Sequence, residues 1–169
     1  MLDRRNVLLS AGATLALAGT SSARAAEGPE AQLNKAMDDF FAQALVNSPE
    51  LATSLGLDKG AMAASKSKLH KGSPADRARY KAENAENLMR LGGIDRKPLS
   101  GMPAVNYDSV IYDLKSQDRI GKRFDYGSQT APYGLSQIDG AYTYIPDFLA
   151  SQHTIETAAD CEAYVARLG

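Results

Sequence analysis

The chain has 169 residues, of which 44% are hydrophobic and 23% charged, and its formal net charge is −1. This length predicts a single domain, and the lack of a basic surplus excludes nucleic acid as the expected partner. A lone cysteine, Cys161, excludes an intrachain disulfide.

The first 25 residues have the pattern of an export signal. A twin arginine, Arg4-Arg5, precedes an apolar run over residues 7–18, and a small-residue segment follows it. This pattern predicts cleavage between Ala25 and Ala26. The run is shorter than the roughly 20 residues that a membrane span needs, which favours a signal over an anchor. The paired arginines favour the twin-arginine route, with general export as the alternative.

The mature chain is therefore expected to be residues 26–169, in the periplasm or secreted. Removing residues 1–25 leaves 16 basic and 19 acidic residues, a net charge of −3. No second apolar run is long enough to cross a membrane, so no span is expected after signal removal.

Two helices are predicted at the start of the mature chain. Apolar residues with helical spacing indicate an amphipathic helix over residues 30–47. Its predicted buried face consists of Leu33, Met37, Phe40, Phe41, Ala44 and Leu45. Ser48-Pro49 then starts a short helix with Leu51 and Leu55 on its apolar face. Gly56 is expected in a left-handed conformation after it.

Residues 58–72 are polar and without periodicity, so an exposed loop is predicted there. Ser65 and Lys68 have the S-x-x-K spacing of penicillin-recognising serine enzymes, in which lysine can activate the serine. The partner motifs S-D-N and K-T-G are absent, which favours a chance match. His70 is expected to be a solvated loop residue.

Two longer helices are predicted next. Ser73-Pro74 starts the first of them and Gly92-Gly93 ends it. Its predicted buried side consists of Ala78, Ala82, Ala85 and Met89, flanked by Leu88 and Leu91. A linker with Pro98, Gly101 and Pro103 follows. The second helix is predicted from an apolar stripe of Tyr107, Val110, Ile111 and Leu114.

Residues 121–140 lack a helical period and are rich in Gly, Ser, Gln and Tyr. Within residues 126–145, Tyr133, Tyr142 and Tyr144 are candidates for a substrate-binding rim. The alternative, which the composition favours, is that these tyrosines cover the core and keep their hydroxyl groups in water.

Two short helices complete the prediction. Pro146 is expected to open one of them, and His153 is expected to be a C-terminal cap or a surface residue, with a pocket residue as the alternative. Thr157 is expected to cap the last helix. Cys161 falls on its apolar stripe and is expected to be a small core residue. The rest of that stripe is Tyr164, Val165 and Leu168.

These elements predict a mainly α fold, an irregular helical array with one Gly/Tyr-rich non-helical segment. It has the character of an incomplete portion of a larger α-helical domain. No catalytic, cofactor-binding or metal-ligating residue can be assigned. A zinc peptidase would need His-Glu-x-x-His, and neither His70 nor His153 stands in that pattern.

The order of four phrases resembles the N-terminal part of the bacterial family called domain of unknown function 885. The phrases are Asp38–Gly56, Leu91–Asp95, Tyr107–Leu114 and Thr157–Leu168. The resemblance implies a largely α-helical protein of several hundred residues, similar to zincin metallopeptidases. It implies zinc in the full-length protein and a His-Glu-x-x-His helix downstream, so no ligand can be carried over to this chain.

The resemblance leads us to expect an exported N-terminal part of a metallopeptidase-like hydrolase, without catalytic residues of its own. Its partner would be the remainder of the same polypeptide, and a peptide-like substrate is possible. A free-standing periplasmic binding module using residues 126–145 is the alternative. A serine hydrolase using Ser65 and Lys68 is a third hypothesis.

Overall fold

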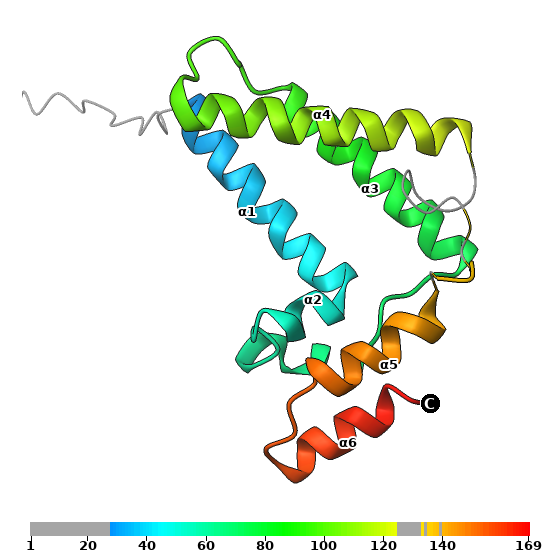
Figure 1. The fold of residues 1–169 in the computed structure, drawn as a ribbon. Coiled ribbons are helices and arrows are strands. Elements are labelled where there is room, and N and C mark those ends of the chain that lie inside the picture. The colour runs from blue at the N-terminus through cyan, green and yellow to red at the C-terminus, as the bar shows by residue number, and fades with distance from the viewer. Residues whose placement is uncertain (1–27, 125–132, 134, 139) are drawn as a thin grey trace, which may run out of the picture.

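The protein is a helical array. Its computed structural model describes residues 28–124, 133, 135–138 and 140–169, and these contain helices and no strand (Figure 1). The mainly α prediction is therefore confirmed. The elements are α1 (Pro29–Asn47), α2 (Pro49–Ser54), the 3-10 helix η1 (Gly60–Ser67), α3 (Pro74–Gly92), α4 (Gly101–Arg123), α5 (Ala141–Ser151) and α6 (Ala158–Ala166). None of the described helices is long and apolar enough to cross a membrane.

Helices α1, α3 and α4 share the main hydrophobic core. Leu33 of α1 and Leu91 of α3 are completely buried in it. From α4, Ile111 and Leu114 contribute to the same cluster. The predicted stripe of α4 is confirmed, since Tyr107 and Val110 also pack against this core. Burial of these apolar side chains is the main force that holds the three helices together.

Helices α3 and α4 run antiparallel and make the closest helix pair (Figure 1). Asn84 of α3 donates a hydrogen bond to the carbonyl of Leu114 in α4. Their connection is fixed by Arg96, whose Nε and Nη2 donate to the two carboxylate oxygens of Asp108 at 2.8 and 2.7 Å. This bidentate geometry orients the connection more firmly than a single contact would.

Polar side chains join α1 to α3 in antiparallel register. Arg90 pairs with Asp39, Asn87 donates to Gln43 Oε1 at 2.6 Å, and Asn47 donates to Glu83 at 2.7 Å. The α1 members are spaced four residues apart and therefore lie on one face of the helix. This face is polar, whereas the face of α1 that points to α4 is apolar.

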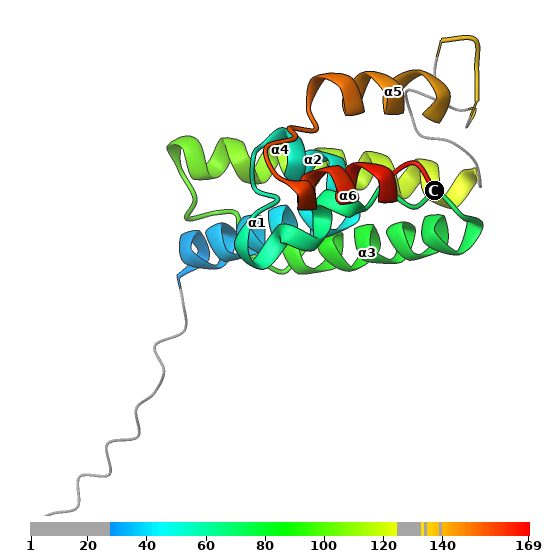
Figure 2. The same ribbon diagram turned by 90° about the horizontal axis from the view of Figure 1, so that it is seen from below.

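The remaining elements, α2, η1, α5 and α6, form a second group. Helix α6 packs on η1, and η1 packs on α2. Figure 2 shows α6 in front and α5 at the margin of the molecule, where α5 makes few contacts with the other helices. The buried apolar residues of α2 and α5 are Pro49, Ala52, Phe148 and Leu149, and α6 buries none.

The predicted buried side of α3 was wrong in part. Met89 is 72% exposed, and Ala78 and Ala82 are exposed as well. Leu88 and Leu91, predicted to flank that side, do pack in the core. The packed side also carries Asn84 and Asn87, which hydrophobicity could not indicate because they are polar residues that hydrogen-bond across to α4 and α1. Phe41, predicted to lie on the buried face of α1, is also exposed, because neither α3 nor α4 covers that side of the helix.

The short elements also differ from the prediction. Leu51 and Leu55 are exposed, while Ala52 and Thr53 face inward. Residues 58–72 are not an open loop, since η1 forms there and buries Ser65. Gly56 does have the expected left-handed conformation, with φ of 67°. Helix α6 packs on η1, and Lys66 of η1 pairs with Asp160, which lies 94 residues further along the chain, so local sequence could not indicate that η1 is covered.

Two helix limits were predicted inaccurately. Helix α4 begins at Gly101 and ends at Arg123, so Gly101 and Pro103 belong to its first turn rather than to a linker. Helix α5 begins at Ala141 and contains Pro146 in its interior. Tyr142 and Tyr144 are therefore helical. The start of α3 is as predicted, because the Ser73 hydroxyl accepts the backbone N–H of Asp76.

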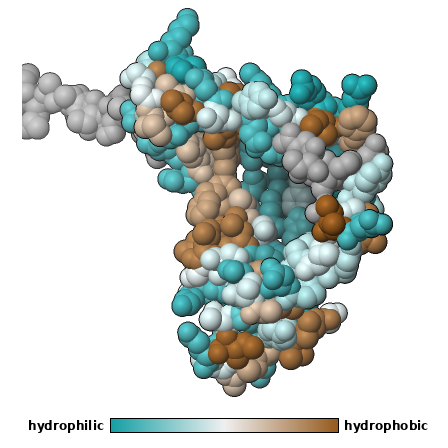
Figure 3. Space-filling model, viewed as in Figure 1, coloured by the Kyte–Doolittle hydropathy of each residue, from teal (hydrophilic) through white to brown (hydrophobic). Residues whose placement is uncertain are grey.

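One face of the molecule is concave. Figure 3 shows a hollow between α1 and α3, with hydrophobic residues along α1 and hydrophilic surface in its depth. The polar contacts between Gln43 and Asn87 and between Asn47 and Glu83 belong to this junction. The hollow therefore has an apolar and a polar wall.

Candidate functional site

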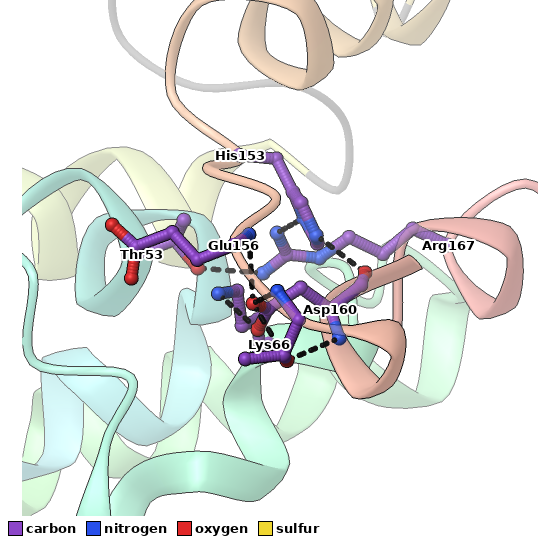
Figure 4. Close-up of polar contacts among 7 residues, drawn as sticks. Thr53, Lys66, His153, Glu156, Asp160 and Arg167 are labelled. Atoms are coloured by element: carbon purple, nitrogen blue, oxygen red, sulfur yellow. Dashed lines mark hydrogen bonds and ion pairs between the residues drawn. The ribbon is translucent and has the colours of Figure 1, made fainter. Parts of the chain in front are cut away.

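The second group of helices is centred on the buried side chain of Arg167, just after α6. Only 5% of Arg167 is exposed, and its guanidinium group makes four hydrogen bonds. Figure 4 shows Arg167 with two of its partners, Thr53 and His153. Nε donates to the carbonyl of Lys68 at 2.9 Å, and Nη1 contacts His153 Nδ1 at 2.7 Å. Nη2 donates to Thr53 Oγ1 at 2.8 Å and to the carbonyl of Ser65 at 2.9 Å. We call these five residues the Arg167 cluster.

The Arg167 cluster connects four separate segments. Thr53 belongs to α2, Ser65 to η1, and His153 to the connection between α5 and α6. The guanidinium carbon also lies 4.9 Å from the ring centre of Phe148 in α5. A planar group with five donors suits such a junction, because it can satisfy several acceptors in fixed directions.

The charge of Arg167 is stabilised by two carboxylates. Burial lowers the pKa of Arg167, whereas the negative charges of Glu50 and Asp58 raise it. Asp58 is 6% exposed, and Glu50 Oε2 is buried without a hydrogen-bond partner. Because arginine stays protonated in proteins, the cluster contains a buried positive charge with two acidic groups close to it.

His153 is buried, so the predicted surface position was wrong, although its backbone N–H does donate to the Phe148 carbonyl at the C-terminal end of α5. It is 6% exposed, and both ring nitrogens have partners. Nδ1 faces Arg167, and Nε2 lies 3.1 Å from the carbonyl oxygen of Asp160. The ring also meets that of Tyr164 edge-on at 5.3 Å. No local pattern indicates this burial, because the contacts come from tertiary packing.

Asp160 provides a second polar anchor for α6. Its Oδ1 accepts a hydrogen bond from Lys66 Nζ of η1 at 2.5 Å. Its Oδ2 accepts from the backbone N–H groups of Glu156 and Thr157, and the Thr157 hydroxyl accepts the Asp160 N–H. The predicted Thr157 cap is confirmed as a complete capping box. These contacts, led by Lys66, hold the pKa of Asp160 far below its usual range.

Replacing Asp160 with asparagine is expected to change the acid stability of the chain. A lowered pKa stabilises the folded state above the unfolded-state value near 3.8, and this contribution is lost as the pH falls below that value. Asp160→Asn should therefore lower the free energy of unfolding at pH 7 and flatten its dependence on pH below about 4. Urea denaturation at a series of pH values measures both effects. If the free energy of unfolding depended on pH below about 4 in the same way in Asp160→Asn as in the native chain, the low pKa of Asp160 would be contradicted.

Ser65 and Lys68 are not arranged for catalysis in the described structure. Ser65 is buried, Lys68 is exposed, and no hydrogen bond joins the Ser65 hydroxyl to the Lys68 ammonium group. Both residues instead offer backbone carbonyls to Arg167. The two residues therefore contribute to the Arg167 cluster through their backbone carbonyls and not through their side chains.

The three tyrosines of the predicted substrate rim are all exposed, but their surroundings differ. Tyr133 is 70% exposed. Tyr142 donates a hydrogen bond to the carbonyl of Ser136 at 2.6 Å. Burial raises the pKa of Tyr144, and the negative charge of Glu50 raises it further. Tyr144 is thus the rim residue that is electrostatically connected with the charges around Arg167. The rest of the Gly/Tyr-rich segment over 125–132 lies outside the described residues.

The remaining predicted residues have varied positions. His70 is exposed as predicted, although its Nδ1 lies 3.1 Å from the Asn47 carbonyl and its ring stacks on Tyr80. Cys161 is exposed, so the predicted core position was wrong. Val165 and Leu168, from the same stripe, are 65% and 64% exposed. Of the stripe of α6, only Tyr164 packs against another described residue, the ring of His153, whereas Cys161, Val165 and Leu168 are exposed.

The export residues Arg4, Arg5, Ala25 and Ala26 lie outside the described residues. Among residues 28–124, 133, 135–138 and 140–169, no group of three His, Cys, Asp or Glu side chains is placed to hold a metal ion. The most connected polar side chain, Arg167, was not singled out from the sequence. A basic residue in the last turn of a helix is typical of dipole stabilisation, so the sequence offered no signal of its burial.

Comparison with known proteins links the chain to a bacterial family. The family model described as "Bacterial protein of unknown function (DUF885)" matches residues 49–169. The match spans α2 to α6 and includes every member of the Arg167 cluster. No curated protein and no solved structure matches the chain.

Proposed function

Because this chain belongs to the bacterial DUF885 family, we propose that residues 26–169 are the N-terminal helical part of an exported metallopeptidase-like hydrolase. Arg4 and Arg5 would direct the precursor to the twin-arginine or general export route, with cleavage between Ala25 and Ala26. The mature protein would act in the periplasm or outside the cell. In this proposal the helices described above form one side of the substrate cleft of the full-length protein and contribute no catalytic residue.

The observation that carries this proposal is the number of large apolar side chains that are exposed to solvent in the described residues. In the described residues, 12 apolar residues are buried, whereas 18 large ones are exposed. The exposed residues include Leu51 and Leu55 of α2, Tyr142 and Tyr144 of α5, and Val165 of α6. Large exposed apolar patches are typical of surfaces that pack against other protein. In the full-length protein, the remainder of the same polypeptide would pack against these exposed apolar residues.

Zinc is expected in the full-length protein, but the described residues do not fit a zinc site. Both ring nitrogens of His153 are engaged by Arg167 and by the Asp160 carbonyl. His70 is held at the junction of α1 and α3 by Asn47 and Tyr80. A catalytic zinc site needs three protein ligands, so the metal would be bound by another part of the polypeptide. Peptides or related amides are the proposed substrates.

A free-standing periplasmic binding module is the second candidate. It is favoured by the exposed tyrosines Tyr133, Tyr142 and Tyr144, and by the Glu50 charge close to Tyr144. In this case residues 126–145 would bind a ligand without zinc.

The size and zinc content of the product in native periplasm distinguish the two candidates. The hydrolase proposal predicts a product several times larger than the 18.1 kDa of this chain, with about one bound zinc per molecule. A chelator should remove its amidase activity. A stable product of residues 26–169 that binds a ligand without zinc would contradict the proposal and support the binding module.

A substitution in α6 tests whether its apolar stripe is covered in the mature protein. Val165→Lys should have little effect on residues 26–169 alone, because Val165 is 65% exposed there. In the large native product it should destabilise the fold, since a charge would be buried against the remaining polypeptide. Glu162→Lys, on an exposed position of the same helix, is the matched control. Equal behaviour of the two variants in the large product would contradict the proposed cover.

A further inference from the structure

We propose that His153 is a proton-sensitive latch, which holds the end of α6 on η1 while its imidazole is neutral and releases it on protonation. The latch consists of the contact between His153 and Arg167 and of the Asp160 carbonyl on the other side of the ring. This inference is independent of the hydrolase assignment, because it concerns residues within the described structure.

The surroundings of His153 select one form of its ring. A guanidinium group has N–H donors and no acceptor. Nδ1, which lies 2.7 Å from Arg167 Nη1, must therefore be the unprotonated acceptor. Nε2 then carries the hydrogen and donates it to the Asp160 carbonyl at 3.1 Å. The neutral Nε2–H tautomer satisfies every polar atom of this contact.

Protonation of Nδ1 would break the contact. It would direct one N–H toward another and bring two positive charges to within hydrogen-bond distance. His153 and Arg167 are 6% and 5% exposed, so water screens this repulsion poorly. Glu50, whose Oε2 is buried without a hydrogen-bond partner, acts on Arg167 through its negative charge and makes no hydrogen bond to it.

The other charged groups around the latch do not replace the lost hydrogen bond. Glu50 and Asp58 act on Arg167, from α2 and from the connection to η1. Lys66 of η1 is already paired with Asp160. The remaining titratable neighbour, Tyr164, presents its ring to His153 edge-on. None of these groups offers His153 Nδ1 a different partner.

Helix α6 is able to respond because polar contacts hold it in place. It buries no side chain of its own within Ala158–Ala166. Its start is fixed by the pair of Asp160 and Lys66, and the low pKa of Asp160 preserves this pair in mild acid. Its end is fixed by Arg167. Repulsion from a protonated His153 would push the guanidinium group of Arg167 away from its other acceptors on Thr53, Ser65 and Lys68. The end of α6 should therefore loosen while its start stays attached.

Hydrogen exchange of the purified chain, read by mass spectrometry as a function of pH, tests the latch. After correction for intrinsic rates, protection of residues 162–169 should fall about tenfold as the pH is lowered from about 8 to about 5. Protection in α3 and α4 should stay constant, because their shared core is apolar. Constant protection of residues 162–169 over this range would overturn the proposal.

Two variants assign the effect to His153. In His153→Asn the side-chain oxygen takes the place of Nδ1 and accepts from Arg167 without titrating, so protection should vary by less than about twofold over this pH range. His70→Gln removes the other histidine and should retain the response of the native chain. A pH response that survives in His153→Asn, or that is lost in His70→Gln, would overturn the proposal.

The tautomer provides a test without substitution. Nitrogen-15 NMR of the native chain at pH 7.5 should show His153 with Nε2 protonated and Nδ1 unprotonated. A signal from the opposite tautomer would overturn the proposal even if the asparagine variant does not fold.

Discussion

Replacing Arg167 with alanine is expected to lower the free energy of unfolding by about 3–5 kcal/mol, the range measured when one partner of a buried ionic contact is removed. The variant leaves Thr53 Oγ1 and the carbonyls of Ser65 and Lys68 without their donor. It also leaves the nearby carboxylates of Glu50 and Asp58 without a counter-charge. Urea denaturation measures the loss. Hydrogen exchange should show it concentrated in η1 and α6.

Two further variants separate charge from geometry. Arg167→Lys keeps the positive charge, but a single ammonium group cannot reach all four acceptors, so a loss of about 2 kcal/mol is expected. Arg90→Ala removes an exposed arginine that pairs with Asp39 and should cost no more than about 1 kcal/mol. If Arg167→Ala destabilised the chain no more than Arg90→Ala does, the buried position of Arg167 would be contradicted.

Replacing Leu91 with alanine is expected to destabilise the chain by about 2–5 kcal/mol. Leu91 is completely buried in α3 and belongs to the core shared with α1 and α4. The loss combines the transfer free energy of the removed methyl groups with the cost of the cavity that remains. Thermal or urea denaturation with α-helical circular dichroism measures it.

Met89 of the same helix is the matched control. It is 72% exposed, so Met89→Ala should change the free energy of unfolding by no more than about 0.5 kcal/mol. The apolar pattern of the sequence placed Met89 on the buried side of α3 with Leu91 beside it, so the pair tests which of the two residues the fold covers. A larger loss for Met89→Ala than for Leu91→Ala would contradict the observed packing of α3.

The predictions for Arg167 and Leu91 concern two kinds of stabilising interaction in the same chain. Helices α1, α3 and α4 are held by an apolar core, which is insensitive to pH and charge. Helix α6 is held by Arg167 and Asp160, and the strength of such contacts depends on protonation and on exact geometry. A change in acidity is therefore expected to act on the second group of helices before it acts on the first.

The sequence by itself determined the elements whose signals are local. The α1 range, the start of α3 at Ser73-Pro74, the left-handed Gly56 and the Thr157 capping box all match the prediction. Each depends on a residue and its neighbours within one turn, so the chain encodes it without reference to distant segments. The mainly α class follows from the same signals, and the phrases that resemble DUF885 agree with the family match.

The tertiary structure decided which faces are covered and which polar residues are buried. Asn84 and Asn87 lie on the packed side of α3 together with Leu88 and Leu91, because amide groups can bridge helices by hydrogen bonds. Arg167 and His153 became buried because segments about 14 to 114 residues away from Arg167 in the chain bring acceptors to the guanidinium group. Hydrophobic periodicity measures the preference of one segment for apolar surroundings. Such a pattern carries no information about a partner that is polar and distant in the chain. For that reason only the folded structure shows the Arg167 cluster.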